Sequence, residues 1–379
     1  MPEGRQPAGA RRGLPLHRGG HQRGPPAAGD GQDRRQARNQ VLTHDLTKDP
    51  QMKALLTREF GDADSFELID APEPTAGAGE VLIKNAYAGV IYADTLIRRG
   101  GYLRWKAAMP SVLGSEVVGT IVAVGDGVEG LAVGDRVSAE LVRGGAYQEL
   151  SVAPASRTTL IPDEASFEEA VVYSFNLPAA YLMYHHFTPI ASDATVLIHS
   201  AAGGLGTMLT LVAKENGNRV IAVVSDESKR EACIANGADE VISRAEHPDY
   251  ENEVLRLTDG EGVDVSINHV AGSTLVNDLK ALKFRGMIML SNALEGLSIL
   301  DAEGSNLYYN KCAKFVVAAS ATLYGTEEHR PALDFLSNWL KRDGLQAPTA
   351  VFPFSKEGVG DAHRLIESGT SVGKIAIRF

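Results

Sequence analysis

The feature that most constrains the fold is the segment VLIHSAAGGLG at residues 196–206. An apolar run typical of a buried strand leads into a turn rich in glycine and alanine. Residues 203–216 then have the pattern of a helix, which Gly217 ends. This order of strand, turn and helix is typical of the first βαβ unit of a dinucleotide-binding fold. Gly203 would let the backbone approach a pyrophosphate, and Gly206 would let helix and strand pack closely.

The helix N-terminus would add free N–H groups and the positive end of a dipole to this phosphate site. A bare strand–helix corner is the structural alternative, but the βαβ context favours nucleotide binding. The residues of the turn that we predict to contact the cofactor are Ala202, Gly203, Gly204, Leu205 and Gly206.

The end of the next strand indicates which dinucleotide would bind. NAD-binding units usually carry a carboxylate there, but this chain has Val224 at that position. The residues that follow include a hydroxyl and two cations, which suit a 2′-phosphate. We therefore predict NADPH, although Asp226 and Glu227 lie close by and a solvated helix start would explain the cations as well. The predicted phosphate contacts are Ser225, Lys229 and Arg230.

The patterns on either side of this unit divide the chain. Strands alternate with helices over residues 177–325, which predicts a doubly wound parallel sheet of the Rossmann type. Residues 52–176 contain short strands separated by Gly-Asp turns, which predicts a β-rich barrel. The segment GKIAIRF at 373–379 is a strand without an obvious partner in the Rossmann unit. We expect residues 326–379 to complete the barrel domain, so the predicted fold class is α/β.

The first 51 residues differ in composition from the rest. They contain 9 Lys and Arg against 5 Asp and Glu, with many Gly, Pro and Gln and few periodic apolar residues. Such a segment cannot bury enough apolar surface to offset its ordering entropy. We predict a disordered basic extension. Whether it is translated from upstream of a natural start at Met52 is left open. A nucleic-acid-binding arm is an alternative, but we do not expect nucleic acid as a partner.

Composition also excludes several classes of protein. No apolar run reaches 18 residues, so we predict no membrane span. The two cysteines, Cys233 and Cys312, cannot form a disulfide framework or a four-cysteine zinc site, and a reducing cytoplasm is the predicted location.

Four segments together resemble the medium-chain dehydrogenase/reductase superfamily, and most closely its zinc-free quinone oxidoreductase and enoyl reductase branch. The resemblance covers nearly all of residues 52–379. It implies a GroES-like substrate domain, a Rossmann domain and a homodimer, and AAGGLG is this branch's usual form of the turn. The segments are GVIYADTLIRRGGY (89–102), LGSEVVGTIVAVGDGVEGLAVGDRV (113–137), LIHSAAGGLG (197–206) and GKIAIRF (373–379).

The resemblance also bears on metal and reaction. Zinc-dependent relatives read GHE where this chain has Gly114, Ser115 and Glu116, and no cysteine precedes these residues in the barrel. We therefore predict no metal, which leaves out Lewis-acid chemistry on a simple alcohol. The implied reaction is hydride transfer from NADPH to a quinone or to an α,β-unsaturated carbonyl, either an enone or an enoyl thioester.

Site residues carried over from the family are the most specific expectations. Tyr102 aligns with a tyrosine that has a proton-donor role in the thioester-reducing branch, so it is the first catalytic candidate. Tyr92 is the second, and we expect it to alternate with Val90 in a strand. A half-buried packing role is the alternative for both. The other predicted cofactor contacts are Asn176, Asn268, Val270, Ser291, Asn292 and Lys374.

Two departures from the family pattern leave a second function open. Ile91 replaces the asparagine of the GVN motif, and Ala179 replaces a threonine on the helix that leads into the Rossmann unit. Both changes remove a polar contact near the nicotinamide, for which Asn176 is a possible replacement. The alternative is therefore a low-turnover NADPH-binding protein of the quinone reductase-like type, with a structural or RNA-associated role.

Overall fold

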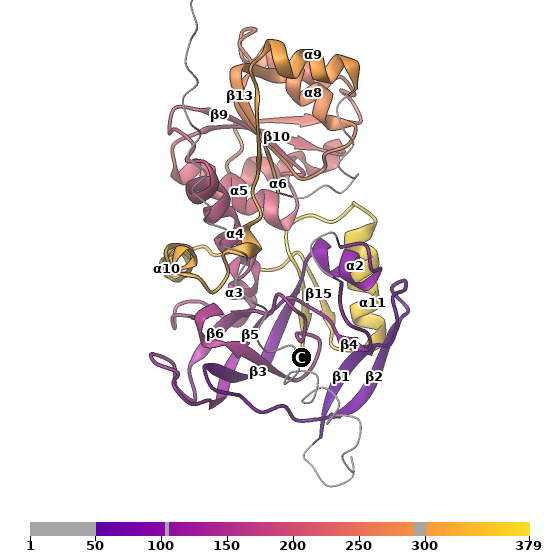
Figure 1. The fold of residues 1–379 in the computed structure, drawn as a ribbon, viewed down its shortest axis with the longest axis vertical. Coiled ribbons are helices and arrows are strands. Elements are labelled where there is room, and N and C mark those ends of the chain that lie inside the picture. Colours follow the sequence, from indigo (N-terminus) through magenta and orange to yellow (C-terminus); the bar gives the residue numbers. More distant parts are fainter. Residues whose placement is uncertain (1–50, 103–105, 292–300) are drawn as a thin grey trace, which may run out of the picture. The chain divides into compact units, whose positions relative to one another are not determined.

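The computed structural model describes residues 51–102, 106–291 and 301–379 (Figure 1). Its strands form two sheets of the barrel part and one sheet of the nucleotide-binding part. The predicted extension at residues 1–51 lies outside the described residues except for Gln51, which begins the first strand.

The larger sheet of the barrel part has seven strands, and residues from both ends of the described chain build it. Its strand order is β15-β16-β3-β5-β6-β8, and β7 also pairs with β3. The strands are β3 (Glu80–Val90), β5 (Glu116–Val124), β6 (Arg136–Glu140), β7 (Leu150–Pro154), β8 (Thr158–Leu160), β15 (Ala350–Pro353) and β16 (Ile375–Arg378). A smaller sheet has the order β2-β1-β4, formed by β1 (Gln51–Thr57), β2 (Phe66–Pro72) and β4 (Ser111–Val112).

The closing strand β16 lies in the barrel sheet, as the sequence predicts for GKIAIRF. It pairs antiparallel with β3, with Ile375 opposite Val90 and Ala376 opposite Gly89. Strand β3 in turn pairs with β5, where Gly89 lies opposite Glu116. Three strands that are remote in sequence therefore meet side by side at the end of β3. This junction forms one wall of the candidate site.

The nucleotide-binding part is a six-stranded parallel sheet with the order β11-β10-β9-β12-β13-β14. Its strands are β9 (Thr195–His199), β10 (Arg219–Val224), β11 (Glu240–Ser243), β12 (Val263–Asn268), β13 (Leu282–Leu290) and β14 (Lys314–Val317). The chain order reverses between β9 and β12, so the edge beyond the carboxyl ends of these two strands is the topological switch point. In doubly wound folds, ligands bind at that edge.

Helices cover both faces of this sheet, and side chains on adjacent strand positions pack into two different cores. Val196 and Ile198 of β9 belong to one apolar cluster, whereas Leu197 between them belongs to another. This burial on both faces explains why the strands are continuous apolar runs. The helices are α5 (Gly204–Glu215), α6 (Arg230–Ala235), α7 (Tyr250–Leu257), α8 (Thr274–Ala281) and α9 (Ala302–Asn310).

The remaining helices connect or cover these sheets. Ser166 and Glu169 form a reciprocal capping box at the start of α3. Figure 1 shows α2 beside α11, and the two helices contact each other. The remaining α-helices are α2 (Tyr92–Arg98), α3 (Phe167–Tyr173), α4 (Asn176–Leu182), α10 (Arg330–Trp339) and α11 (Lys356–Glu367). The short 3₁₀ and π helices are η1 (Ala155–Arg157), η2 (Met183–Phe187), η3 (Glu227–Lys229), η4 (Ser320–Thr322) and η5 (Glu327–His329).

Among the described residues, every helix is too short or too polar to cross a membrane.

Candidate nucleotide and acceptor site

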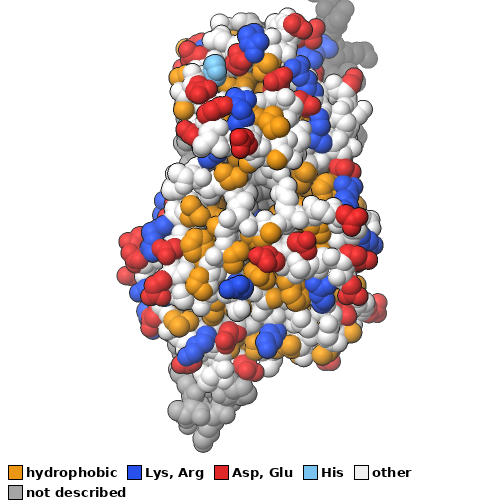
Figure 2. All heavy atoms as spheres, turned by 180° about the vertical axis from the view of Figure 1, so that it is seen from behind, with side chains coloured by type: hydrophobic (Ala, Val, Ile, Leu, Met, Phe, Trp, Pro, Cys, Tyr) orange, Lys and Arg blue, Asp and Glu red, His pale blue; other side chains and the backbone are white. Residues whose placement is uncertain are grey.

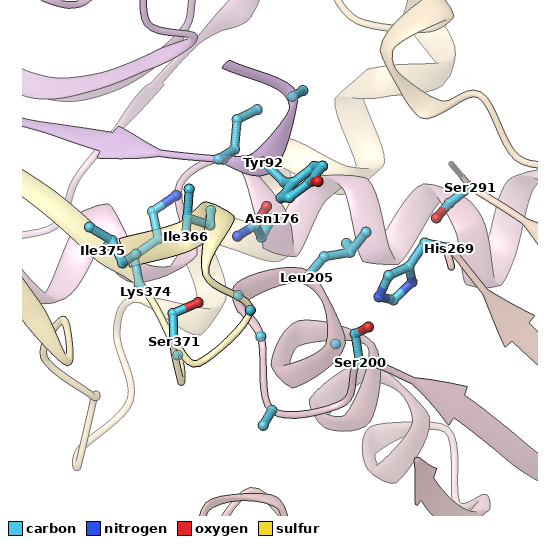
Figure 3. Close-up of a pocket in the computed structure, with 18 of the residues that line it drawn as sticks. Tyr92, Asn176, Ser200, Leu205, His269, Ser291, Ile366, Ser371, Lys374 and Ile375 are labelled. Atoms are coloured by element: carbon cyan, nitrogen blue, oxygen red, sulfur yellow. The ribbon is translucent and has the colours of Figure 1, made fainter. Parts of the chain in front are cut away.

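A cavity of about 420 Å³ lies where the barrel part meets the switch point of the parallel sheet. This volume is within the usual range for small-molecule sites, roughly 300–1,000 Å³. Its walls come from the end of β3 and the start of α2, from α4, from the turn between β9 and α5, and from residues 366–375. Figure 3 shows side chains from all of these segments directed toward one space.

The glycine turn forms the floor of this cavity. All five residues predicted to contact the cofactor in the turn line it. Gly203 is the N-cap of α5, and no side chain caps this helix end. The N–H groups of its first turn are therefore available to a ligand. At Gly206 an added Cβ would overlap the backbone of Ser200 and Ala201, which explains the need for glycine where strand and helix pack.

The segment that leads into β16 lies against this turn. The N–H of Gly373 donates to the carbonyl of Ala202 at 2.7 Å, and Gly373 also forms an isolated parallel bridge with Gly203. Earlier in the same segment, the carbonyl of Gly369 accepts a hydrogen bond from Lys229 Nζ. We call residues 369–374 the closing segment. It contacts both the glycine turn and Lys229, one of the cations predicted to bind the 2′-phosphate.

The ends of β10 and β11 place two cations and a hydroxyl at one end of the cavity. Ser225 and Lys229 line it, with Lys229 Nζ 3.0 Å from Ser225 Oγ, and burial lowers the pKa of Lys229. Arg244 also lines it, and no described residue forms an ion pair with its guanidinium. Val224 and Ser243 are in register, which brings Ser225 and Arg244 to adjacent strand ends.

The structure does not place Arg230 in this group. Its guanidinium is paired with the carboxylate of Glu227, with a second nitrogen 3.0 Å from Glu227 Oε2, and it does not line the cavity. The prediction for Arg230 is therefore not supported, because a local i,i+3 partner already satisfies this cation. Arg244 was missed because it follows a different strand, and only the register of β10 with β11 brings it to the site.

The ends of β12 and β13 line the opposite side of the cavity. Val270 and Ser291 lie there as predicted, but Asn268 does not. The amide nitrogen of Asn268 donates to Thr274 Oγ1 at 2.8 Å and to Asp278 at 2.6 Å. Its oxygen accepts from the N–H groups of Val270 and Ala271. Asn268 thus fixes the turn that follows β12 and does not face the cavity. The predicted Asn292 lies outside the described residues.

His269 is a lining residue that the sequence reasoning missed. It is 7 % exposed, and its Nδ1 has no hydrogen-bond partner among the described residues. Burial, with a smaller contribution from His199, lowers its pKa to about 4. The imidazole is therefore neutral at neutral pH and can donate or accept one hydrogen bond. His269 directly follows β12, at the edge of the sheet where ligands bind in such folds, and this position was the signal that the sequence offered.

The two predicted phenols occupy different environments. Strand β3 ends at Val90, and Tyr92 is the first residue of α2, so the expectation that Tyr92 alternates with Val90 in a strand is wrong. Tyr92 lines the cavity (Figure 3). Tyr102 is half-buried against the apolar core of the barrel and is not a lining residue. The structure therefore does not support the predicted priority of Tyr102.

The acceptor side of the cavity has apolar walls and few polar atoms. Ile91, Phe175, Ala179 and Met183 line it, together with the polar side chains of Asn176 and Lys374. Asn176 begins α4, and a Cβ on Gly204 would approach its Nδ2 at 2.7 Å, so the two residues lie in close contact. Both predicted polar contacts, Asn176 and Lys374, are therefore in the lining.

Comparison with known proteins agrees with this arrangement. The family model for the alcohol dehydrogenase GroES-like domain matches residues 77–163, and that for zinc-binding dehydrogenases matches residues 204–338. The quinone oxidoreductase of Rattus norvegicus is 32% identical over 330 residues, covering 86% of this chain and 97% of the relative. A probable quinone oxidoreductase of Schizosaccharomyces pombe is 30% identical over 324 residues, covering 84% and 94%.

A mycobacterial protein solved in complex with NADPH has a similar structure, with a TM-score of 0.79 and 30% identity, covering 86% of this chain and 100% of that chain. This chain belongs to the medium-chain dehydrogenase/reductase superfamily, in its quinone oxidoreductase branch. The predicted α/β fold, a GroES-like part joined to a Rossmann-like parallel sheet, is thereby confirmed.

Within this superfamily, the position of the missing zinc ligand has another use here. Ser115 Oγ donates to Asp94 Oδ1 at 2.5 Å, and the phenol of Tyr147 lies 3.3 Å from Asp94 Oδ2. Burial nevertheless raises the pKa of Asp94 to about 6. Across the described ranges, no three or more His, Cys, Asp and Glu side chains are grouped as a metal site would need. Ser115 thus belongs to a buried hydrogen-bond network of the barrel.

Proposed function

We propose that this chain is a zinc-independent, NADPH-dependent reductase that transfers hydride to a quinone or to an α,β-unsaturated carbonyl. One observation carries the proposal: a single cavity joins an uncapped glycine turn, two cations without an ion-pair partner among the described residues, and an apolar acceptor wall. Each part matches one part of the reaction, namely the pyrophosphate, the 2′-phosphate and the conjugated acceptor.

The residues present fit NADPH along the switch-point edge. The turn at residues 202–206 would hold the pyrophosphate at the α5 N-terminus. On one side, Ser225, Lys229 and Arg244 would hold the 2′-phosphate, because a hydroxyl and two cations favour an anion. On the other side, the second nucleotide would lie over β12 and β13. The mycobacterial relative solved with NADPH supports this choice of cofactor.

When bound, the reduced nicotinamide supplies the hydride. The chain's own residues would orient a flat, conjugated acceptor between Ile91, Phe175 and Met183 and exclude water from it. The Tyr92 phenol would donate a hydrogen bond to the acceptor's carbonyl oxygen, which stabilises the charge that develops there. The amide of Asn176 offers a second polar contact, in place of the asparagine and threonine that Ile91 and Ala179 replace.

A screen of NADPH and NADH oxidation against quinones, enones and enoyl thioesters tests this proposal. We expect turnover with at least one conjugated acceptor, with NADPH preferred over NADH and chelators without effect. Binding of NADPH without turnover of any acceptor class would refute the reductase and favour the low-turnover alternative. Inhibition by chelators would refute zinc independence.

The RNA-associated form of that alternative has little support in the described residues. Figure 2 shows Lys and Arg interspersed with Asp and Glu over one face of the molecule, without a one-sign surface. Nucleic-acid-binding faces are basic patches or stripes. A cytoplasmic homodimer remains part of the proposal, to be tested by light scattering of the purified protein and by localisation of a tagged chain.

A further inference from the structure

A buried ion pair lies at the acceptor wall of the cavity. Lys374 Nζ contacts Glu116 Oε1, and Ser174 Oγ donates to Glu116 Oε2 at 2.6 Å. The Lys374 side chain is 2 % exposed and that of Glu116 is completely buried. The three residues come from the closing segment, from β5 and from the end of α3, so only the folded chain assembles them.

The barrel sheet is built around this pair. Gly89 lies between Ala376 and Glu116 in register, and a Cβ at Gly89 would overlap both Glu116 Oε1 and Lys374 Cε. Stability alone does not account for such a construction, because apolar side chains of similar volume would usually be as stable as a buried ion pair. A buried charge kept at this cost next to a ligand cavity points to a role in chemistry.

Lys374 is also the member of the pair that lines the cavity. Figure 3 shows its side chain on the same side of the cavity as Tyr92 and Asn176. Burial lowers the pKa of Lys374 to about 7, and the Asp94 carboxylate opposes this shift. An ammonium with such a pKa can release and regain a proton at neutral pH, as a general acid must.

We propose that Lys374 supplies the proton that completes reduction of an unsaturated carbonyl, with Glu116 and Ser174 as its positioning residues. This inference rests on the proposed function. Hydride that the bound reduced nicotinamide would supply forms a C–H bond at the β-carbon of the acceptor, and the electrons of the C=C bond shift toward the carbonyl oxygen to give an enolate. One N–H bond of the Lys374 ammonium then breaks as a C–H bond forms at the α-carbon of the enolate, and the carbonyl is restored. The neutral amine stays beside the Glu116 carboxylate and regains a proton from water after the product leaves.

Other titratable groups lie near Lys374 or line the same cavity. The Tyr92 phenol lines it and is the proposed hydrogen-bond donor to the carbonyl oxygen, which is a different role. Asp94 from α2 lies outside the lining and is held by Ser115 and Tyr147, and the neutral imidazole of His269 is a weak acid. The charged groups on the other walls of the cavity are Lys229 and Arg244 at its nucleotide end and Glu367 from α11, which is paired with Arg98 and Arg99.

The test compares Lys374→Arg with wild type and with Lys311→Arg in the full chain. Lys311 is a matched control, because burial also lowers its pKa while it lies outside the cavity lining. Turnover of an enone and of a quinone is measured from pH 5.5 to 9.5, together with NADPH affinity by fluorescence titration. The Nζ titration of lysine is followed in parallel by NMR with isotope-labelled lysine.

We expect wild-type enone turnover to fall as pH rises through about 7, because the acid must be protonated. Lys374→Arg should lower it about 10²- to 10⁴-fold and remove this fall, since a guanidinium does not release its proton. Quinone turnover should fall less than enone turnover, because a hydroquinone anion takes protons from water. The NADPH titration shows how much of each loss comes from cofactor binding, because both acceptors share the cofactor. Lys311→Arg should behave as wild type.

Glu116→Gln gives a second reading if Lys374→Arg destabilises the fold. Loss of the carboxylate should move the fall in enone turnover to lower pH by about one unit or more, because the ammonium loses its partner. A purely structural pair would leave the pH profile in place. Retention of that profile in both variants, or unchanged enone turnover in Lys374→Arg, would overturn the inference.

If wild type reduces no acceptor, the proposed function fails and the NMR titration decides the inference separately. A lysine that titrates near pH 7 in wild type and is absent in Lys374→Arg supports a poised proton donor. Titration of every lysine above about pH 9 rules it out, because such an ammonium does not differ from an ordinary one.

Discussion

The two ends of the cavity are built in different ways. At the nucleotide end, the turn and the cations sit at the carboxyl ends of neighbouring parallel strands, and each group lies within a few residues of a strand that the sequence marks clearly. At the acceptor end, Tyr92, Asn176 and Lys374 come from three segments that only the tertiary structure joins. Most groups of the first end directly follow strands of one sheet, whereas the second end is assembled from segments that only packing brings together.

The acceptor end depends most on the phenol of Tyr92. Tyr92→Phe should lower enone turnover about 10²-fold or more, because the phenol is the proposed hydrogen-bond donor to the carbonyl oxygen. Tyr102→Phe should change it less than about threefold, since that ring packs against the barrel core. Steady-state kinetics on a common enone measure both.

NADPH affinity serves as the control for these two variants and should stay unchanged in each. The opposite order, with the larger loss in Tyr102→Phe, would show that the family alignment locates the catalytic phenol better than the cavity lining does.

The nucleotide end depends on the two cations near Ser225. Lys229→Gln and Arg244→Gln should each weaken NADPH binding by about 10- to 100-fold, since one charge on a phosphate contributes about 1–3 kcal/mol. NADH binding should hardly change. Arg230→Gln is the matched control, because Glu227 already holds that guanidinium. Equal losses for both cofactors would mean that these cations do not bind the 2′-phosphate.

A third effect concerns the buried network around Asp94. Its pKa of about 6 in the folded chain lies above the ordinary value of 3.8. The folded protein therefore keeps this proton to higher pH than the unfolded chain, and stability falls as pH rises from about 4 to about 6. Asp94→Asn should remove that fall, which amounts to about 3 kcal/mol. Urea unfolding of both proteins at several pH values measures the difference.

Other titrating groups cancel when wild type and Asp94→Asn are compared at each pH. A difference in unfolding free energy that does not change with pH would mean that Asp94 is ionised throughout, with its hydrogen bonds outweighing burial.

The smallest expected effect concerns residues 1–48. Their composition predicts no contribution to a core, and β1 begins at Gln51. A chain without them should keep its melting temperature within about 1 °C and its turnover unchanged. A drop of several degrees would instead show that this segment docks on the folded part.

What the sequence could predict follows the same division. The predictions for the turn, Ser225, Lys229 and the closing strand depend on local patterns and one unpaired strand. The structure places the turn, Ser225 and Lys229 in the cavity lining and pairs β16 with β3. Arg244 depended on strand register, which no single segment encodes. His269 was missed because the neighbouring Asn268 resembles the family's polar position, although its side chain faces the helix behind the turn.

The closing segment has a consequence for how the protein is made. Its contacts with Ala202 and with Lys229 supply part of the wall of the nucleotide cavity. Along the chain, most strands of the parallel sheet and both α10 and α11 lie between the glycine turn and this segment. A nascent chain therefore exposes the turn on the ribosome well before this wall exists. The complete wall of this cavity therefore forms only after translation has passed Lys374.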